Sequence, residues 1–198
     1  MASASSSSSI PPQPPTSYSH HVFLSFKGKT RTRFISHLYA ALERKGIRTY
    51  KDDKNLRKGD HISHELVKAI EESMFAVIVF SPEYASSSWC LDELCKIIEC
   101  KDKQGLQMVQ VFYDVEPSDV RHQKGTFQKA FEEHKQKGRH DSEKVQRWRN
   151  ALNQSTISVA APPPSRCIVL PPILLIESST SKLRRDERSH NRSGIVKK

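Results

Sequence analysis

The sequence predicts a parallel, doubly wound α/β sheet, because strand-like and helix-like segments alternate four times and the clearest strand is apolar on both faces. That strand is the uninterrupted, strongly β-forming run FAVIVF at residues 75–80. A strand of this kind must be covered on both faces, as in a sheet with helices on either side. In such folds, ligands bind beside the carboxyl ends of the strands.

The elements follow in order along the chain. Residues 22–26 form a short apolar strand, and a helix with one apolar face follows and ends near Gly46. Residues 47–50 form a second strand, and after a polar loop Ser63 can cap a second helix. After residues 75–80, Ser87 or Ser88 can cap a third helix, and residues 108–113 supply a fourth strand. The predicted apolar helix faces carry Phe34, Ile35, Leu38 and Leu42; Leu66, Val67 and Ile70; and Leu91, Leu94, Cys95 and Ile98.

The remaining elements are shorter or less regular. A turn or short helix is expected at residues 116–121, and Phe127 and Trp148 each mark a further helix. A fifth strand and a closing helix are not evident. Residues 167–170 or 173–176 could add a strand, but Pro171 and Pro172 permit it only at the edge of the sheet. We therefore divide the chain into a Ser/Pro-rich leader at 1–17, a folded domain at 18–154 and a Pro-rich, basic tail at 155–198, with both ends largely disordered.

Charge and composition exclude several classes of protein. The formal net charge is +10, but lysine and arginine are dispersed and no basic stripe is interleaved with aromatics, which disfavours nucleic-acid binding. The apolar run at 167–176 is far shorter than the roughly 20 residues that span a bilayer, so no membrane segment is expected. The cysteines contain no C-x-x-C pair, and His61 and His64 are poorly placed for a metal, so we expect reduced thiols and no metal site.

Six motifs stand in order along the chain: VFLSFKG at 22–28, FISHLY at 34–39, DDKNLRKG at 52–59, SWCLDEL at 88–94, VFYDV at 111–115 and PSDVR at 117–121. Together they resemble a plant TIR domain, as in TIR-only proteins or a truncated TIR-type disease-resistance receptor. The resemblance covers about residues 18–152. It implies a flavodoxin-like parallel sheet flanked by helices, with the last strand and helix missing or atypical.

The resemblance implies an NAD⁺ nucleosidase of plant innate immunity, in which Glu93 is the catalytic residue and NAD⁺ is the substrate, with no other cofactor. The chemistry is reasonable, because nicotinamide leaves as a neutral ring and one carboxylate can stabilise the developing oxocarbenium charge. Trp89 lies four residues earlier, on the same helical face. Without the resemblance, the Asp92-Glu93 pair would be interpreted as favourable charge in the first helical turn, and Trp89 as a core or rim aromatic.

The family's NAD⁺ site also draws on the loops after the first and second strands. By resemblance, the substrate-binding residues here are Lys27, Gly28, Lys29, Thr30, Arg31, Gly59 and Trp89. The first loop departs from the family, because it is one residue shorter and has the basic Lys29 where acidic residues are common. We expect this change to weaken nucleotide binding.

Self-association is the second implied property. In the family, a Ser-His pair on the first helix, here Ser36 and His37, packs with the last helix of the domain. In this sequence an unrelated tail replaces the closing helix, so we expect half of that interface to be missing. A catalytically weak TIR–TIR interaction module that regulates full-length receptors is therefore the alternative function. Other TIR domains are the expected partners, and the expected location is the cytoplasm, with the nucleus second.

Overall fold

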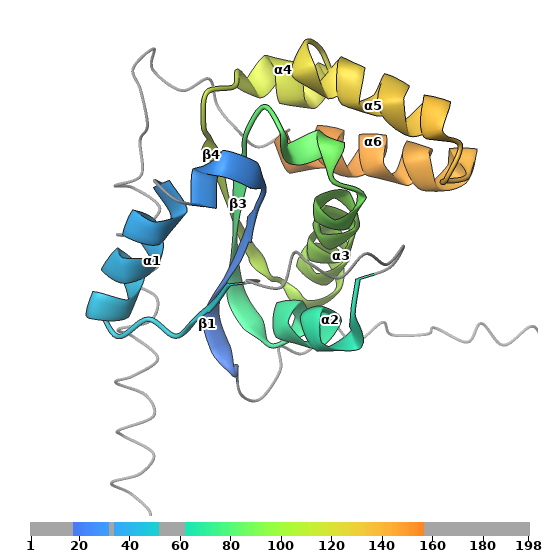
Figure 1. Ribbon diagram of the computed structural model, residues 1–198. Coiled ribbons are helices and arrows are strands. Elements are labelled where there is room, and N and C mark those ends of the chain that lie inside the picture. Colours follow the sequence, from blue (N-terminus) through green and yellow to red (C-terminus); the bar gives the residue numbers. More distant parts are fainter. Residues whose placement is uncertain (1–17, 32–33, 52–61, 157–198) are drawn as a thin grey trace, which may run out of the picture.

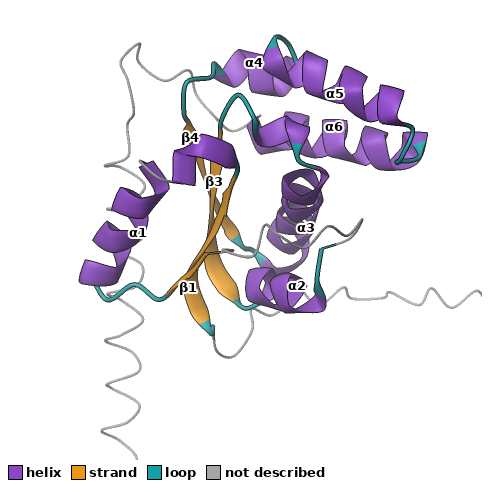
Figure 2. Ribbon diagram, viewed as in Figure 1, coloured by secondary structure: helices purple, strands orange, loops and turns teal. Residues whose placement is uncertain are grey.

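The computed structural model describes residues 18–31, 34–51 and 62–156. Within these residues the strands are β1 (His20–Phe26), β2 (Thr49–Lys51), β3 (Ser73–Phe80) and β4 (Gln107–Phe112). All neighbouring pairs are parallel, in the order β2-β1-β3-β4. Figure 2 shows the strands in orange with helices on either side. The predicted parallel α/β sheet is confirmed. The predicted leader at 1–17, the loop at 52–61 and the tail from 157 onward lie outside the described residues.

Helices cover both faces of the sheet. Helix α1 (Phe34–Arg44) lies on one face, and α2 (His64–Glu71) and α3 (Ser88–Gln104) lie on the other (Figure 1). Helices α4 (Pro117–His122), α5 (Thr126–Lys137) and α6 (Ser142–Thr156) gather beside α3, towards the carboxyl ends of the strands. Two 3₁₀ turns, η1 (Gly28–Arg31) and η2 (Tyr84–Ser86), follow β1 and β3.

Local signals explain where two helices begin. The Ser63 hydroxyl accepts the backbone N–H of Leu66 at 3.3 Å, as predicted for the cap of α2. Ser87 accepts the N–H of Cys90 at 3.4 Å, so it is the cap of α3 and Ser88 is the first helical residue. Both helices therefore begin where hydroxyl side chains replace the missing turn of backbone acceptors.

Alternation along β1 divides the core in two. Val22, Leu24 and Phe26 pack with α1, whereas Phe23 packs into the cluster formed with α2 and α3. Ser25 has the same parity as Phe23, so its hydroxyl points to the α3 side. The larger cluster extends into α4, α5 and α6, where the fully buried Trp148 is its largest side chain.

Two boundaries differ from the sequence prediction. Strand β2 spans only three residues, and Ile47, expected to begin it, is buried just before it. Helix α6 continues to Thr156, with Ser155 and Thr156 both buried, so these two residues belong to the folded part and not to the tail.

Candidate functional site

The candidate site lies at the point where the chain changes direction across the sheet. Strand β1 is followed by α1 on one face and by β2 at one side, whereas β3 is followed by α3 on the opposite face and by β4 at the other side. The loops that leave β1 and β3 therefore diverge at the carboxyl ends of the strands, the position where doubly wound folds bind ligands. Most of the predicted site residues that the structure describes lie on these loops or at the start of α3.

Glu93 lies in the second turn of α3 and is only 3% exposed. The interpretation of Asp92 and Glu93 as first-turn charges is wrong, because the helix begins at Ser88 and its first turn contains no acidic residue. Burial of a carboxyl group is costly unless it is hydrogen-bonded. The Ser25 hydroxyl supplies such a bond, donating to Glu93 Oε2 at 2.6 Å from the end of β1.

A second buried hydroxyl stands behind the first. The Tyr84 hydroxyl on η2 lies 2.9 Å from Ser25 Oγ and donates to the carbonyl of Cys90 at 3.1 Å. The Cys90 thiol in turn lies 3.5 Å from the carbonyl of Phe26. Strand β1, turn η2 and helix α3 thus meet through polar contacts at one buried point. Sequence reasoning missed Ser25 and Tyr84, although a serine inside an otherwise apolar strand was a signal.

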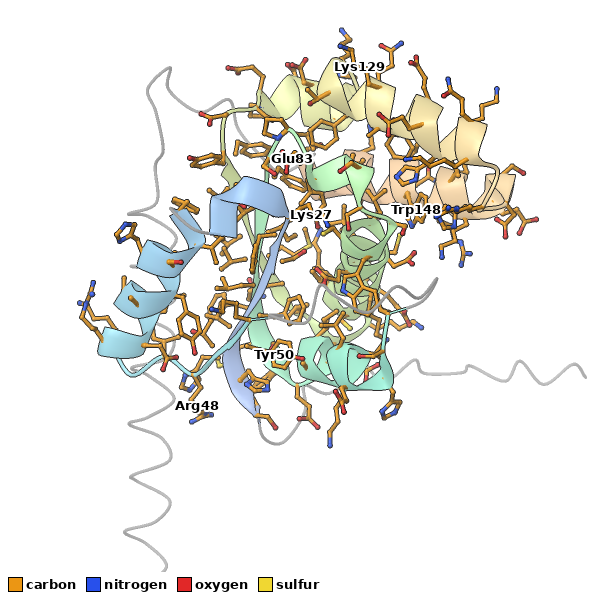
Figure 3. The ribbon with its side chains drawn as sticks, viewed as in Figure 1. Lys27, Arg48, Tyr50, Glu83, Lys129 and Trp148 are labelled. Carbon is orange, nitrogen blue, oxygen red and sulfur yellow. The ribbon has the colours of Figure 1, made fainter. Side chains whose placement is uncertain are left out.

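The loop after β1 begins next to these buried polar contacts, since the Phe26 carbonyl takes part in them. Gly28 has φ +73°, and a methyl group there would collide with the Glu83 carboxylate, which lies against the glycine. The Thr30 hydroxyl is buried and donates to the Lys27 carbonyl at 2.7 Å, which stabilises η1. Figure 3 shows Lys27 and Glu83 at the same end of the molecule. Glu83 is a carboxylate beside the loop after β1 that the sequence prediction did not include.

Of the other predicted substrate-binding residues, the structure describes one in full, two only by their backbone and one not at all. Trp89 is partly buried at the start of α3, and its buried indole N–H has no hydrogen-bond partner among the residues that the structure describes. The backbones of Lys29 and Arg31 belong to η1, but their side chains are not described, and Gly59 lies outside the described residues. Ser36 and His37 are exposed on α1, on the opposite face of the sheet from α3.

Helices α5 and α6 form polar contacts with the two elements that carry Tyr84 and Glu93, namely η2 and α3. Asp92 accepts the indole N–H of Trp148 at 2.8 Å and forms an ion pair with Lys144 at 3.0 Å, both on α6. His134 on α5 lies 2.9 Å from the carbonyl of Ala85 through Nε2, next to Tyr84 on η2. Because a carbonyl only accepts, Nε2 carries the proton. The helix with Glu93 and the turn with Tyr84 are therefore both tied to the last two described helices.

Other chemistries find little support in the described ranges. Cys95 and Cys100 are free thiols, and burial raises the pKa of each to about 11, so both stay protonated. Residues 18–31, 34–51 and 62–156 contain no cluster of three or more metal-ligating side chains. Among the same residues, no helix is long and apolar enough to cross a membrane.

Comparison with known proteins agrees with this architecture. The TIR domain family model matches residues 19–161. The chain is 54% identical over 156 residues to TMV resistance protein N of Nicotiana glutinosa, a match that covers 78% of this chain and 13% of that protein. It is 52% identical over 153 residues to disease resistance protein RPV1 of Vitis rotundifolia, covering 77% and 11%.

A solved structure of the activated Roq1 resistosome, in its TIR domains, is 52% identical with a TM-score of 0.65, covering 70% of this chain and 84% of that one. The fold and the family match together define a TIR domain, and the chain belongs to that family. More particularly, its sequence places it with the TIR domains of plant disease-resistance proteins. It spans only 13% and 11% of the length of the two resistance proteins.

Proposed function

We propose that this domain is an immune-signalling NADase that cleaves the bond between nicotinamide and ribose in NAD⁺, with Glu93 as the catalytic residue. The observation that carries the proposal is the buried Glu93 carboxyl group at the carboxyl end of β1, held by the Ser25 hydroxyl at 2.6 Å. Buried carboxyl groups are concentrated at functional sites, which supports a functional role for Glu93. NAD⁺ is the substrate, and no further cofactor takes part.

Cleavage of the bond between nicotinamide and ribose requires few catalytic groups besides one carboxylate. Nicotinamide departs as a neutral ring from a pyridinium, so no general acid has to protonate it, unlike the leaving group of an ordinary glycoside. The positive charge that develops on the ribose is stabilised by a nearby carboxylate, whose effect is large where water is excluded. Glu93 also accepts hydrogen bonds from ribose hydroxyls in this proposal, which orients the reacting bond.

We propose that groups near Glu93 bind the substrate. The indole N–H of Trp89 has no acceptor within the described part of the chain, and we propose that it donates to an acceptor on the substrate. The loop with Lys27, Gly28 and Thr30 approaches the same end of β1, and we propose that it contacts the pyrophosphate. Lys29, Arg31 and Gly59 remain predicted members of this binding surface.

The test is nicotinamide release from NAD⁺ by the wild type and by Glu93→Gln, which keeps the side chain's shape and removes its charge. Loss of the carboxylate is expected to lower kcat by at least about a hundredfold. Glu99→Gln on the same helix is the matched control, because Glu99 is exposed and pairs with Lys103 at 2.8 Å away from the site. A Glu93→Gln protein that releases nicotinamide like the wild type contradicts the proposal.

A second candidate function is association with other TIR domains without appreciable catalysis. It is favoured by the exposed positions of Ser36 and His37 on α1 and by the 52% identity to TIR domains solved within an assembled resistosome. Light scattering on His37→Ala tests this function. A lower association state in that variant, together with unchanged association in Glu93→Gln and no nicotinamide release from the wild type, selects the interaction module over the enzyme.

A further inference from the structure

Three buried side-chain oxygen atoms, from Tyr84, Ser25 and Glu93, form a short chain of hydrogen bonds that ends at Glu93. Ser25 Oγ lies 2.6 Å from Glu93 Oε2 and 2.9 Å from the Tyr84 hydroxyl, which lies 3.1 Å from the Cys90 carbonyl. Ser25 and Tyr84 are fully buried and Glu93 nearly so. The chain links β1, η2 and α3, the three elements that converge at the candidate site.

Counting protons gives the chain a direction. An ionised carboxylate only accepts hydrogen bonds, so the single Ser25 proton is given to Glu93 at 2.6 Å, the shortest contact of the chain. Ser25 Oγ then has only lone pairs for Tyr84, which becomes the donor at 2.9 Å. The one Tyr84 proton is shared between Ser25 and the Cys90 carbonyl. Donors aligned head to tail in this way polarise each other and strengthen the bond to the carboxylate.

The donors are held by rigid parts of the fold. Ser25 lies in a central strand and pairs in register with Ile78 of β3. The Tyr84 ring packs edge-on against Phe80 with 5.0 Å between ring centroids, and His134 holds the next residue of η2 through the Ala85 carbonyl. Burial raises the pKa of Tyr84 well above its usual value, so its hydroxyl keeps its proton.

We propose that Ser25 and Tyr84 are positioning residues that fix the orientation of the Glu93 carboxylate, an inference that rests on the proposed NAD⁺ cleavage. Ser25 holds one carboxyl oxygen directly, and Tyr84 orients the Ser25 hydroxyl. The other carboxyl oxygen is thereby directed consistently towards the ribose. A displacement of about 1 Å in such a group can lower the rate a hundredfold.

The experiment compares Ser25→Ala and Tyr84→Phe with Ser73→Ala in the full chain, measuring kcat and KM for NAD⁺ and the midpoint of thermal unfolding. Ser73 is a matched control, because its buried hydroxyl donates to the Ala69 carbonyl at 2.6 Å at the other end of β3. We expect kcat to fall about tenfold or more in Ser25→Ala and by a smaller factor in Tyr84→Phe, with KM nearly unchanged. Ser73→Ala loses thermal stability but keeps its kcat.

A readout that needs no activity accompanies the kinetics. The side-chain carboxyl carbon of Glu93 is followed by NMR in ¹³C-glutamate-labelled protein, with its resonance assigned from Glu93→Gln. We expect this resonance to move in Ser25→Ala and in Tyr84→Phe and to stay at the wild-type position in Ser73→Ala. If Ser25→Ala fails to fold, Tyr84→Phe decides, because phenylalanine keeps the ring against Phe80.

The outcomes separate the two proposals. A wild type that releases no nicotinamide contradicts the proposed function. In that case the NMR resonance of the Glu93 carboxyl carbon alone decides whether the two hydroxyls orient Glu93. An active wild type whose Ser25→Ala and Tyr84→Phe variants match Ser73→Ala, in both kcat and the resonance, overturns the positioning role and leaves the enzyme intact.

Discussion

Replacing Asp92 by alanine is expected to lower the free energy of unfolding by about 3 kcal/mol, because one side chain serves two partners on α6. Asp92 accepts the Trp148 indole N–H at 2.8 Å and pairs with the Lys144 ammonium at 3.0 Å. The Asp92 and Lys144 side chains are only 16% and 12% exposed, so water replaces the lost bonds poorly.

The magnitude follows from two separate losses. A buried donor left without its acceptor, here the Trp148 indole, costs about 1–3 kcal/mol. Removing one partner of a fully buried ion pair costs about 3–5 kcal/mol, and the partial exposure of Asp92 and Lys144 reduces this loss to about 1–2 kcal/mol. The two losses together come to about 3 kcal/mol. Asp92→Asn keeps an acceptor for Trp148 and loses only the charge. We therefore expect it to cost about half as much as the alanine substitution.

The assay is urea unfolding at neutral pH, followed by tryptophan fluorescence. Glu99→Ala is the control on the same helix, because its ion pair with Lys103 is 43% and 70% exposed and should contribute no more than about 1 kcal/mol. A loss in Asp92→Ala no larger than the loss in Glu99→Ala would refute the reasoning, since the contact with α6 would then contribute no more than a surface ion pair.

The remaining predictions concern a histidine, two glycines and a core leucine. Burial lowers the pKa of His134 below its ordinary 6.5, so the unfolded chain binds this proton more readily than the folded one. The contribution of neutral His134 to stability is complete above about pH 6.5 and is lost as the pH falls through the folded-state pKa. Urea unfolding of His134→Phe should show a smaller loss of stability over this pH range than the wild type. Gly28→Ala should be more destabilising than Gly105→Ala, because both glycines have φ above +70° but only at Gly28 must a neighbour, the Glu83 carboxylate, also move; equal unfolding midpoints would contradict this. Leu94→Ala, at a fully buried position of α3, should cost about 2–5 kcal/mol by urea unfolding, and a loss under about 1 kcal/mol would mean that the core there is loosely packed.

Much of the fold could be predicted because its signals are local. The run at residues 75–80 is apolar on both faces, which already requires helices on either side of the strand, and β3 is buried accordingly. Ser63 and Ser87 mark helix starts because a cap needs only a hydroxyl and the next turn of backbone. Boundaries were less well predicted: Ile47 is buried without belonging to β2, since the apolar pattern reports burial and not strand pairing.

The candidate site, like the fold, could be predicted from the sequence only in part. The sequence by itself determined which carboxylate to propose, through the motif around Glu93, and determined the α/β class through its alternating apolar segments. Only the tertiary structure decided what surrounds that carboxylate. Ser25 and Tyr84 are 59 residues apart in the chain, and Asp92 and Trp148 are 56 apart, so no local pattern relates them. Their hydrogen bonds exist because sheet pairing and helix packing exclude water and bring distant polar groups within reach of each other.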